Sequence, residues 1–251
     1  GKTDDNIEKL NSLEFVGVVD PLFAGTRAVL GGGQDGTSSE TPINVIQYKT
    51  VTTDGNTFDF GDLQSARFGL KGSGSNITLG IFAGGKTSSS NNVTDTDKIT
   101  VATTGSEADF ADLGVGARMG GAGGASNGTL LFCCGGRAAS GRIDSKEYFT
   151  IASASTGTDA GDLDKAKSGI AASNGNSKFL IAGGYDGGSG NEDVIEYHTF
   201  STSADSSSTG TLGATDQEGY MISSVARAVY FRGNSSSAVM EFMTVASEGN
   251  A

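Results

Sequence analysis

An apolar run that ends in a pair of glycines recurs along this sequence at a nearly constant interval. The run reads VLGGG, IFAGG, FCCGG and LIAGG in four copies, and the fifth copy, VYFRGN, has an arginine in place of the first glycine. The five anchor pairs are Gly32–Gly33, Gly84–Gly85, Gly135–Gly136, Gly183–Gly184 and Arg232–Gly233. They lie 48 to 52 residues apart and fill the chain of 251 residues. A repeat of this length indicates a solenoid, a propeller or an array.

Each unit contains the same series of short apolar segments. A polar loop and an alternating segment follow each anchor pair; the alternating segments are Val45–Thr53, Asp95–Thr103, Ser145–Ser153, Asp193–Ser201 and Ala238–Ala246. Such alternation predicts half-buried strands, and no stretch keeps a helical period. The unit can be written as strands a (RFGLKGS), b (TLGIFAG), c (VIQYKTVTT) and d (TFDFGDL). Four short antiparallel strands with tight turns form one blade of a β-propeller. We therefore predict an all-β, five-bladed propeller in a single domain over residues 1–251.

The two ends of the chain are predicted to meet in one blade. The last copy supplies strands a, b and c only, whereas TDDNIEKLNSL at the N-terminus is in phase with a strand d, so that Leu10 corresponds to Leu63. An N-terminal strand that completes the last blade would close the ring and leave no open sheet edge. The alternative is an incomplete ring that another subunit closes.

Several residue types keep their phase in the repeat, and we interpret them as structural. The glycine pairs allow the chain to leave strand b with positive φ angles. The phenylalanine and leucine of DFGDL are expected to pack between blades. Its aspartates are expected to accept backbone N–H bonds in a turn or to pair with the basic residue that opens strand a. The aspartates are Asp59, Asp62, Asp109, Asp112, Asp159 and Asp162, the basic residues are Arg67, Arg118 and Lys167, and the copy near Thr209–Leu212 has lost the acids. Calcium, which binds clustered carboxylates, is the alternative ligand for these aspartates; we expect no cofactor.

Charge and cysteine content restrict the partners and the compartment. The chain has 17 Lys and Arg against 29 Asp and Glu, a net charge of −12, which argues against a nucleic-acid partner. Cys133 and Cys134 are adjacent, so they cannot form an unstrained disulfide with each other, and we expect buried thiols and a reducing compartment during assembly. No apolar segment approaches the ~18 residues of a membrane span. The sequence has no signal peptide and begins at Gly1 without Met, which suggests a cleaved chain.

No set of residues indicates a catalytic or metal site. His198, the only histidine, lies in VIEYHTF, where alternation assigns it to the polar, solvated face of a strand. A Ser/His/Asp triad or a zinc site would need further partners beside it. The loop YDGGSGNED resembles a calcium loop in composition only, and GGAGGASNG lacks the strand-to-helix context of a phosphate loop. We therefore expect no catalytic residue and no enzymatic activity.

The order of motifs resembles the kelch repeat over about residues 14–246. The shared features are a basic residue that opens a glycine-containing strand, an apolar run that ends in a glycine pair, and an alternating strand with a tyrosine (Tyr48, Tyr148, Tyr197). The chain departs from ordinary kelch blades because it has no tryptophan and has DFGDL in its place. The segments YKTVTTDGNTFDFGDLQSAR and ITVATTGSEADFADL are similar to kelch-like repeats in structural proteins of marine tailed bacteriophages, including cyanophages.

This resemblance implies a virion component, assembled in the host cytoplasm, such as a capsid decoration, a fibre or a tail-associated protein. Its partners would be other virion proteins, in multiple symmetric copies, with no nucleic-acid binding and no membrane insertion. The alternative function is a recognition module that binds a glycan or protein on the host surface. An enzyme would place its chemistry in the funnel on the propeller axis, where this chain offers mostly Gly, Ser, Thr and Asn.

Overall fold

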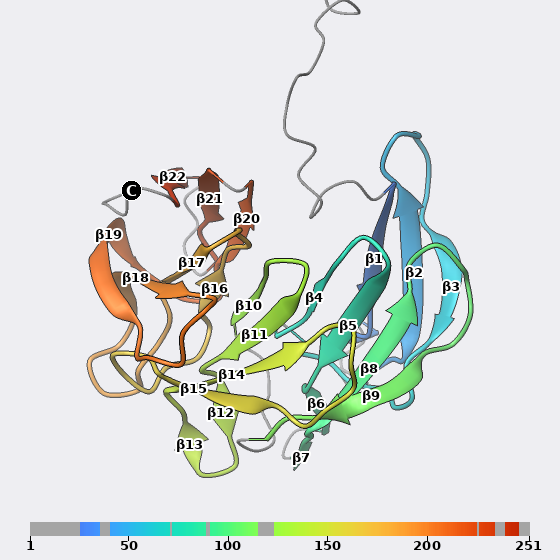
Figure 1. Ribbon diagram of the computed structural model, residues 1–251, viewed down its shortest axis with the longest axis horizontal. Helices are drawn as coiled ribbons and strands as arrows, with labels where there is room; N and C mark the ends of the chain where they lie inside the picture. The colour runs from blue at the N-terminus through green and yellow to red at the C-terminus, as the bar shows by residue number, and fades with distance from the viewer. Residues whose placement is uncertain are drawn as a thin grey trace, which may run out of the picture.

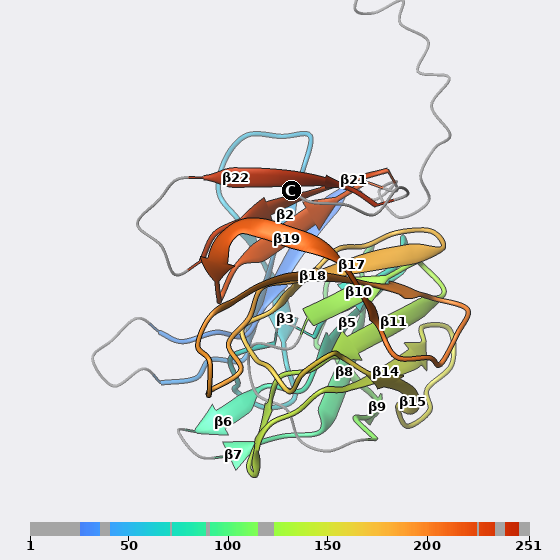
Figure 2. The same cartoon turned by 90° about the vertical axis from the view of Figure 1, so that its left-hand side faces the viewer.

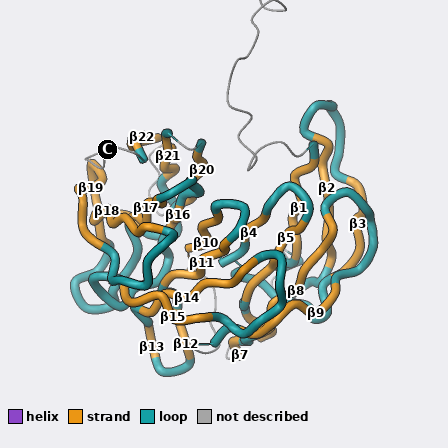
Figure 3. Tube along the Cα trace, in the orientation of Figure 1, coloured by secondary structure: helices purple, strands orange, loops and turns teal. Residues whose placement is uncertain are grey.

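The computed structural model describes residues 26–35, 41–70, 72–88, 91–114, 123–224, 226–233 and 239–245. These residues form strands, turns and loops but no helix, and five small antiparallel sheets stand in a ring (Figures 1 and 3). The predicted all-β, five-bladed propeller is confirmed. In this part of the chain, no helix has the length and apolar character needed to cross a membrane.

The blades follow one another along the chain, and the strands of each blade run from the axis outwards. Blade 1 contains β1 (Arg27–Gly31), β2 (Val45–Thr50) and β3 (Phe58–Asp62). Blade 2 contains β4 (Gly74–Ser75), β5 (Leu79–Ala83), β8 (Asp95–Thr100) and β9 (Ala108–Asp112). Blade 3 contains β10 (Gly123–Ser126), β11 (Leu130–Cys134), β14 (Ser145–Thr150) and β15 (Thr158–Asp162).

The later blades keep the same plan. Blade 4 contains β16 (Ala171–Ala172), β17 (Lys178–Ala182), β18 (Glu192–Thr199) and β19 (Ser207–Asp216). Blade 5 contains β20 (Tyr220–Ser223), β21 (Arg227–Phe231) and β22 (Met240–Thr244). Two ribbons lie in the loops between strands b and c, where we predicted only polar loops: β6 (Lys86–Ser88) with β7 (Asn91–Asn92), and β12 (Arg137–Ala138) with β13 (Gly141–Arg142).

The innermost strands are short and made of small residues. Strands β4, β10, β16 and β20 contact one another in turn around the axis, and the stacking of the sheets is visible from the side in Figure 2. A Cβ atom added to Gly123 would lie 2.9 Å from the Cβ of Ala172 in the next blade. Glycine is therefore needed here for the close approach of two inner strands.

Two kinds of predicted strand boundary are wrong. In blades 1 to 3, strand c ends three residues before its predicted end, because the amides of Thr53, Thr103 and Ser153 turn back to bond the carbonyls three residues before them, at 3.3, 3.1 and 3.0 Å. Strand a of blade 2 begins at Gly74, not at Arg67. Because strand d lies at the outer edge and strand a at the axis, the residues between them must cross the width of the blade.

The core is divided into layers between neighbouring blades. Phe110 and Leu113 of blade 2 pack against Leu131 and Phe149 of blade 3, and Phe60 and Leu63 do the same between blades 1 and 2. The prediction that the DFGDL apolar residues lie between blades is confirmed. Cys133 and Cys134 are 1% and 0% exposed, which confirms the buried thiols.

The first and last blades each have three strands in the described part of the chain. Blade 1 has no inner strand beside β1, and blade 5 has no outer strand beside β22. Figure 1 shows these two sheets standing apart on the upper side of the ring. The predicted N-terminal closing strand lies outside the described residues, so ring closure stays a prediction.

Substitution of Phe179 tests the layered core. Its side chain is fully buried between blades 3 and 4, with ring centroids 5.2 Å from Phe132 and 4.8 Å from Phe200. We expect Phe179→Ala to lower the free energy of unfolding by about 3–5 kcal/mol, because it leaves a cavity in the layer. Urea unfolding followed by far-UV circular dichroism measures this change. The control is Phe58→Ala, because Phe58 is 57% exposed; equal losses for the two variants would contradict the layered core.

Candidate functional site

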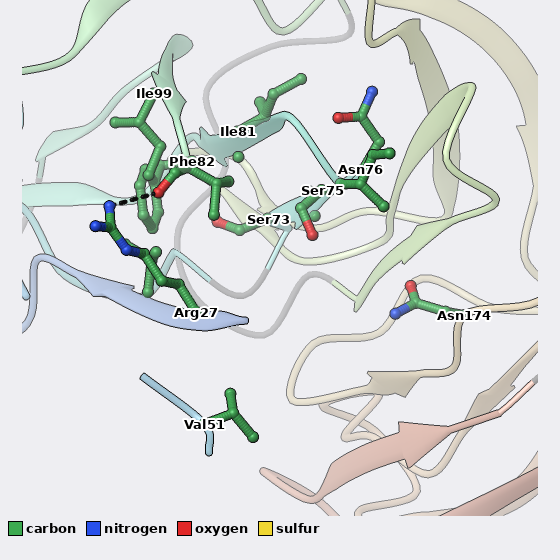
Figure 4. A pocket seen from close by; sticks show the side chains of 14 residues that line it. Arg27, Val51, Ser73, Ser75, Asn76, Ile81, Phe82, Ile99 and Asn174 are labelled. Carbon is green, nitrogen blue, oxygen red and sulfur yellow. Dashed lines mark hydrogen bonds between the residues drawn. The ribbon is translucent and has the colours of Figure 1, made fainter. Parts of the chain in front are cut away.

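A hollow lies beside the inner strands, between blades 1 and 2 (Figure 4). It has a volume of ≈ 560 Å³ and an apolar wall that includes Val29, Phe82 and Ile99. Arg27 stands on one side, where its Nη1 donates to the carbonyls of Val101 and Ala102 at 3.0 and 2.9 Å. The cavity lies along the inner edge of β1, where the other blades have strand a.

A chain of hydrogen bonds joins the inner strands around the mouth of this cavity. Ser126 Oγ donates to the carbonyl of Ser75 at 2.9 Å, and the Ser126 amide donates to Asn174 Oδ1 at 2.8 Å. The Asn174 amide in turn donates to Ser223 Oγ at 2.8 Å. Each of these four residues stands four positions before strand b of its blade. Of these residues, Ser75 and Asn174 line the cavity, so polar groups stand beside its apolar wall, an arrangement that suits a polar ligand.

The second candidate surface is the face of blade 5 that points away from blade 4. Tyr220, Ile222, Met240 and Phe242 on this face are 60–64% exposed. The pair Val229–Phe242 is the fifth copy of the cross-strand pair Leu180–Tyr197, which blade 4 packs against blade 5. These blade 5 residues are therefore arranged like an inter-blade layer, but their side chains are exposed. The arginine Arg227 stacks on Phe242 with its guanidinium carbon 4.9 Å from the ring centroid.

The predicted basic residues connect consecutive blades, but with partners other than those expected. Arg67 forms an ion pair with Asp97 of blade 2, and both side chains are fully buried. Lys167 pairs with Glu196 of blade 4, also fully buried, and with Asp164 Oδ1 at 2.9 Å. For Arg67 and Lys167, the expected pairing with the DFGDL aspartates is wrong, because both cations are buried whereas those aspartates are exposed. Arg118 lies outside the described residues.

The repeated aspartates lie on the outer edge strands rather than in turns. Their side chains are exposed in β3, β9 and β15, while the residue that follows the first aspartate of each pair is buried; the aspartates are Asp59, Asp62, Asp109, Asp112, Asp159 and Asp162. The loop of the following blade covers the backbone of each edge. Gly105, Gly157 and Ser206 donate their amides to Phe60, Asp112 and Asp162 at 2.7, 3.0 and 2.9 Å. No group of three or more His, Cys, Asp or Glu residues in the described ranges could hold a metal ion.

Each glycine pair connects strand b to strand c and to the segment around the basic residue where one blade passes to the next. We call this segment the joint. All eight glycines of the four pairs have φ angles between 56° and 122°. The amide of Gly32 bonds strand c at Val45 at 3.0 Å, and the amide of Gly33 donates to the carbonyl of Arg67 at 2.9 Å. Gly136 makes the same 2.9 Å bond to Lys167. A Cβ on Gly135 would lie 2.8 Å from the Lys167 carbonyl, so the pair also leaves room for the joint.

The last joint moves its positive charge to another position of the repeat. Asp216 occupies the position of the basic residue, and its backbone carbonyl accepts a hydrogen bond from the Gly184 amide at 2.8 Å. Arg232, in place of the first glycine, donates from Nε to Glu241 at 2.9 Å. Tyr230 donates to Asp216 at 3.0 Å, and burial together with this carboxylate raises the pKa of the tyrosine.

Sequence reasoning missed the acids that these cations hold. Asp97, Glu147, Glu196 and Glu241 occupy one register position of strand c in blades 2 to 5, where blade 1 has Gln47. The first three are fully buried. Burial raises the pKa of Asp97, although Arg67 acts in the opposite direction. The sequence does contain a signal for these residues, because an acid recurs at one position of strand c. We missed it because we assigned acids in alternating strands to the solvent-exposed face.

The expectation for His198 is wrong for the same reason. The side chain is buried, with its ring centroid 5.0 Å from that of Phe132 and 5.4 Å from that of Phe179, and Nε2 lies 3.2 Å from the Thr202 carbonyl oxygen. Both faces of blade 4 are covered by neighbouring blades, so alternation does not mark a solvated face. Burial, followed by the charge of Lys146, lowers the pKa of His198 to about 4.

Removal of the Lys167 charge tests the joint between blades 3 and 4. Lys167→Met leaves the carboxylate of Glu196 buried without its cation, so we expect the free energy of unfolding to fall by about 3–5 kcal/mol. The double variant Lys167→Met/Glu196→Met removes both charges and should recover most of that loss. Differential scanning calorimetry compares the stabilities of the three proteins. If Lys167→Met were as stable as the wild type, the ion pair would not stabilise the contact between blades 3 and 4.

Acid should destabilise the protein in part through His198. Its folded pKa of about 4 lies below its ordinary value of 6.5, so the folded state binds fewer protons than the unfolded state between these values. The stabilisation is complete above about pH 6.5 and falls by roughly 3 kcal/mol as the pH decreases to about 4. In His198→Phe this part of the pH dependence should disappear, measured as the difference from wild type in urea unfolding across that range. Parallel curves for the two proteins would refute the assignment.

No protein-family model matches the chain, and no curated protein matches it.

Proposed function

We propose that this propeller is a non-enzymatic structural protein that docks on neighbouring proteins of a larger assembly through the open face of blade 5. The observation that carries this proposal is the exposure of four large apolar side chains, Tyr220, Ile222, Met240 and Phe242, on one side of one sheet. Contiguous exposed apolar surface on a chain with a net charge of −12 is typical of an interaction site. Aromatic residues, Met and Arg are enriched in protein interfaces, and Arg227 borders this face.

The face of blade 1 fits blade 5 less well than the faces that are buried elsewhere in the ring. At one register of strand c, blades 2 to 5 bury Ile99, Phe149, His198 and Met243 against the preceding blade. Blade 1 has Lys49 at this position. Contact with blade 5 would take the lysine charge out of water, which costs free energy without an ionic partner. A separate protein with an apolar surface is the better occupant, in agreement with the alternative of a ring that another subunit completes.

The setting that we propose is a virion. Support comes from the resemblance of YKTVTTDGNTFDFGDLQSAR and related segments to kelch-like repeats of marine tailed phages, together with a five-bladed propeller that is compatible with kelch-like blades. The partners would be other virion proteins at symmetric positions, and the chain would serve as a capsid decoration, a fibre or a tail-associated protein.

The axial cavity favours a second candidate function, recognition of a glycan or protein on the host surface. Asn76 and Asn174 stand at its rim, Arg27 on one side and Ile99 on its apolar wall. Amides and a guanidinium above apolar side chains fit a polar ligand that presents hydroxyl or acidic groups.

Hydroxyl-radical footprinting with mass spectrometry tests the docking proposal on the isolated chain and on the assembled particle. We expect labelling of Met240 and Phe242 to fall at least severalfold in the particle, because the docked partner covers them. The variant Ile222→Thr/Phe242→Thr should lose incorporation into particles, while Ile77→Thr, at an apolar side chain that is 52% exposed on blade 2, should be incorporated normally.

Equal labelling of Met240 and Phe242 in both states, or normal incorporation of the double variant, would overturn the docking proposal. Binding to a glycan array that Asn76→Ala and Asn174→Ala abolish would support the recognition function instead.

A further inference from the structure

The face of blade 1 that points away from blade 2 carries apolar side chains at positions that are buried in other blades. Leu30 in β1 is 59% exposed, and Val51, just after β2, is 64% exposed. At the Leu30 register, the later blades bury a side chain against the preceding blade; these residues are Phe82, Cys133, Ile181 and Tyr230. At the Val51 position, blades 3 to 5 bury Ile151, Phe200 and Val245 in the same way. Leu30 and Val51, together with Val45, Gln47 and Lys49, form a surface that we call the blade 1 face. Its layout continues that of the surfaces that pack against another blade.

One residue of the blade 1 face departs from this series. Lys49 occupies the register at which the later blades bury Ile99, Phe149, His198 and Met243. Its Nζ donates to the carbonyl of Gly55 in the same blade at 2.5 Å. Asp59 lies opposite Gln47 in the register rather than opposite Lys49, and the ion pairs among the described residues join other side chains. Within this part of the chain, Lys49 thus has a carbonyl as its partner but no carboxylate.

The charges of the blade 1 face are reversed relative to the joints inside the ring. In those joints, a cation at the end of one blade pairs with an acid in strand c of the next, as in Lys167–Glu196. Blade 1 has the neutral Gln47 at the position of the acid, and Thr57 of the same blade donates to its side-chain oxygen at 3.0 Å. Lys49 places a cation two residues further along the strand. A neighbour that packs here therefore needs to bring a carboxylate rather than a cation.

The face of blade 5 does not bring this carboxylate. Its described side chains are apolar or carry a hydroxyl group, apart from Arg227. Contact between the two faces, within one chain or between two copies, would add a second cation where Lys49 needs an acid. Like charges brought together in an interface suppress the wrong partner. The occupant that fits the blade 1 face is therefore a different protein.

We propose that the blade 1 face binds a neighbouring protein of the assembly through an apolar surface that carries a carboxylate opposite Lys49. This inference rests on the proposed function, because it takes a protein of the same larger assembly as the occupant. Lys49 then determines which neighbour fits. An apolar surface without an acid would bury the lysine charge unpaired, which costs free energy, whereas a surface with an acid forms an ion pair.

Carbodiimide crosslinking of the assembled particle tests the pairing, because this reagent joins an amine to a carboxylate that contacts it. Mass spectrometry of the digested particle should show Lys49 joined to an Asp or Glu residue of a different protein. Acetylation of Lys49 by an N-hydroxysuccinimide ester should fall at least severalfold from the isolated chain to the particle, because the docked protein covers the amine.

Charge variants test whether Lys49 selects the partner. Lys49→Glu should lower incorporation into particles at least about tenfold, because it places two acids together in the interface. Lys49→Arg keeps the charge and should be incorporated normally. Lys86→Glu is the matched control, because Lys86 is a half-buried lysine in β6 of blade 2, outside the blade 1 face. Thermal unfolding of the isolated Lys49→Glu chain should match that of the wild type, because the described residues give Lys49 no acid partner.

A lower melting temperature of the isolated Lys49→Glu chain, normal incorporation of this variant, or a crosslink of Lys49 only to a carboxylate of the same chain or of a second copy would overturn the inference. Its failure is distinguishable from failure of the proposed function, which Met240 and Phe242 on blade 5 report. Protection of these two residues in the particle with unchanged acetylation of Lys49 would overturn the inference and leave docking through blade 5 intact. Unchanged labelling of all three residues would overturn both.

Discussion

The ring depends on one kind of contact, in which an acid buried in strand c of one blade is bonded by the end of the preceding blade. Each blade alone is a thin sheet of four strands or fewer, too small to bury a core of its own. The contacts that position neighbouring blades are the ion pair Arg67–Asp97 and its relative Lys167–Glu196. They set the distance at which the apolar layers meet, and the layers then supply most of the burial.

The unusual composition of the chain follows from this construction. Glycine pairs let strand b end beside the carbonyl of the joint residue, as at Gly33 and Gly136. Small residues in the inner strands allow the blades to converge on the axis, as at Gly123. The edge strands carry exposed aspartates, while a loop of the next blade covers their backbone. Charge on an edge strand discourages pairing with foreign strands, so the same residues that mark the repeat also keep its rim soluble.

The repeat alone predicts the number of blades, the antiparallel strands and the packing of Phe60 or Phe110 between blades, because these depend on a period that is visible in the sequence. It does not predict His198 or Glu196 correctly, because alternation distinguishes two faces of a strand but does not tell whether a neighbouring blade covers the polar one. The start of strand a was predicted too early, because Arg67 binds Asp97 at the joint before the chain reaches the propeller axis. The sequence analysis did not identify the residues of either candidate surface. Among the described residues, the face of blade 5 and the axial cavity lie where a repeat has no neighbouring strand or blade, and a periodic pattern carries no information about such a position.

The joints also suggest how the ring responds as a unit. Loss of one buried ion pair should also destabilise the apolar layer beside it, because the same strands carry the residues of both. Native-state hydrogen exchange, resolved to single amides, tests this central claim most directly. The account predicts that the joint amides of Gly33, Gly136 and Gly184 exchange as slowly as the amides in the middle of β11 and β17, through one global opening. Joint amides that exchange far faster than these strands would mean that the blades open independently, and would contradict the account.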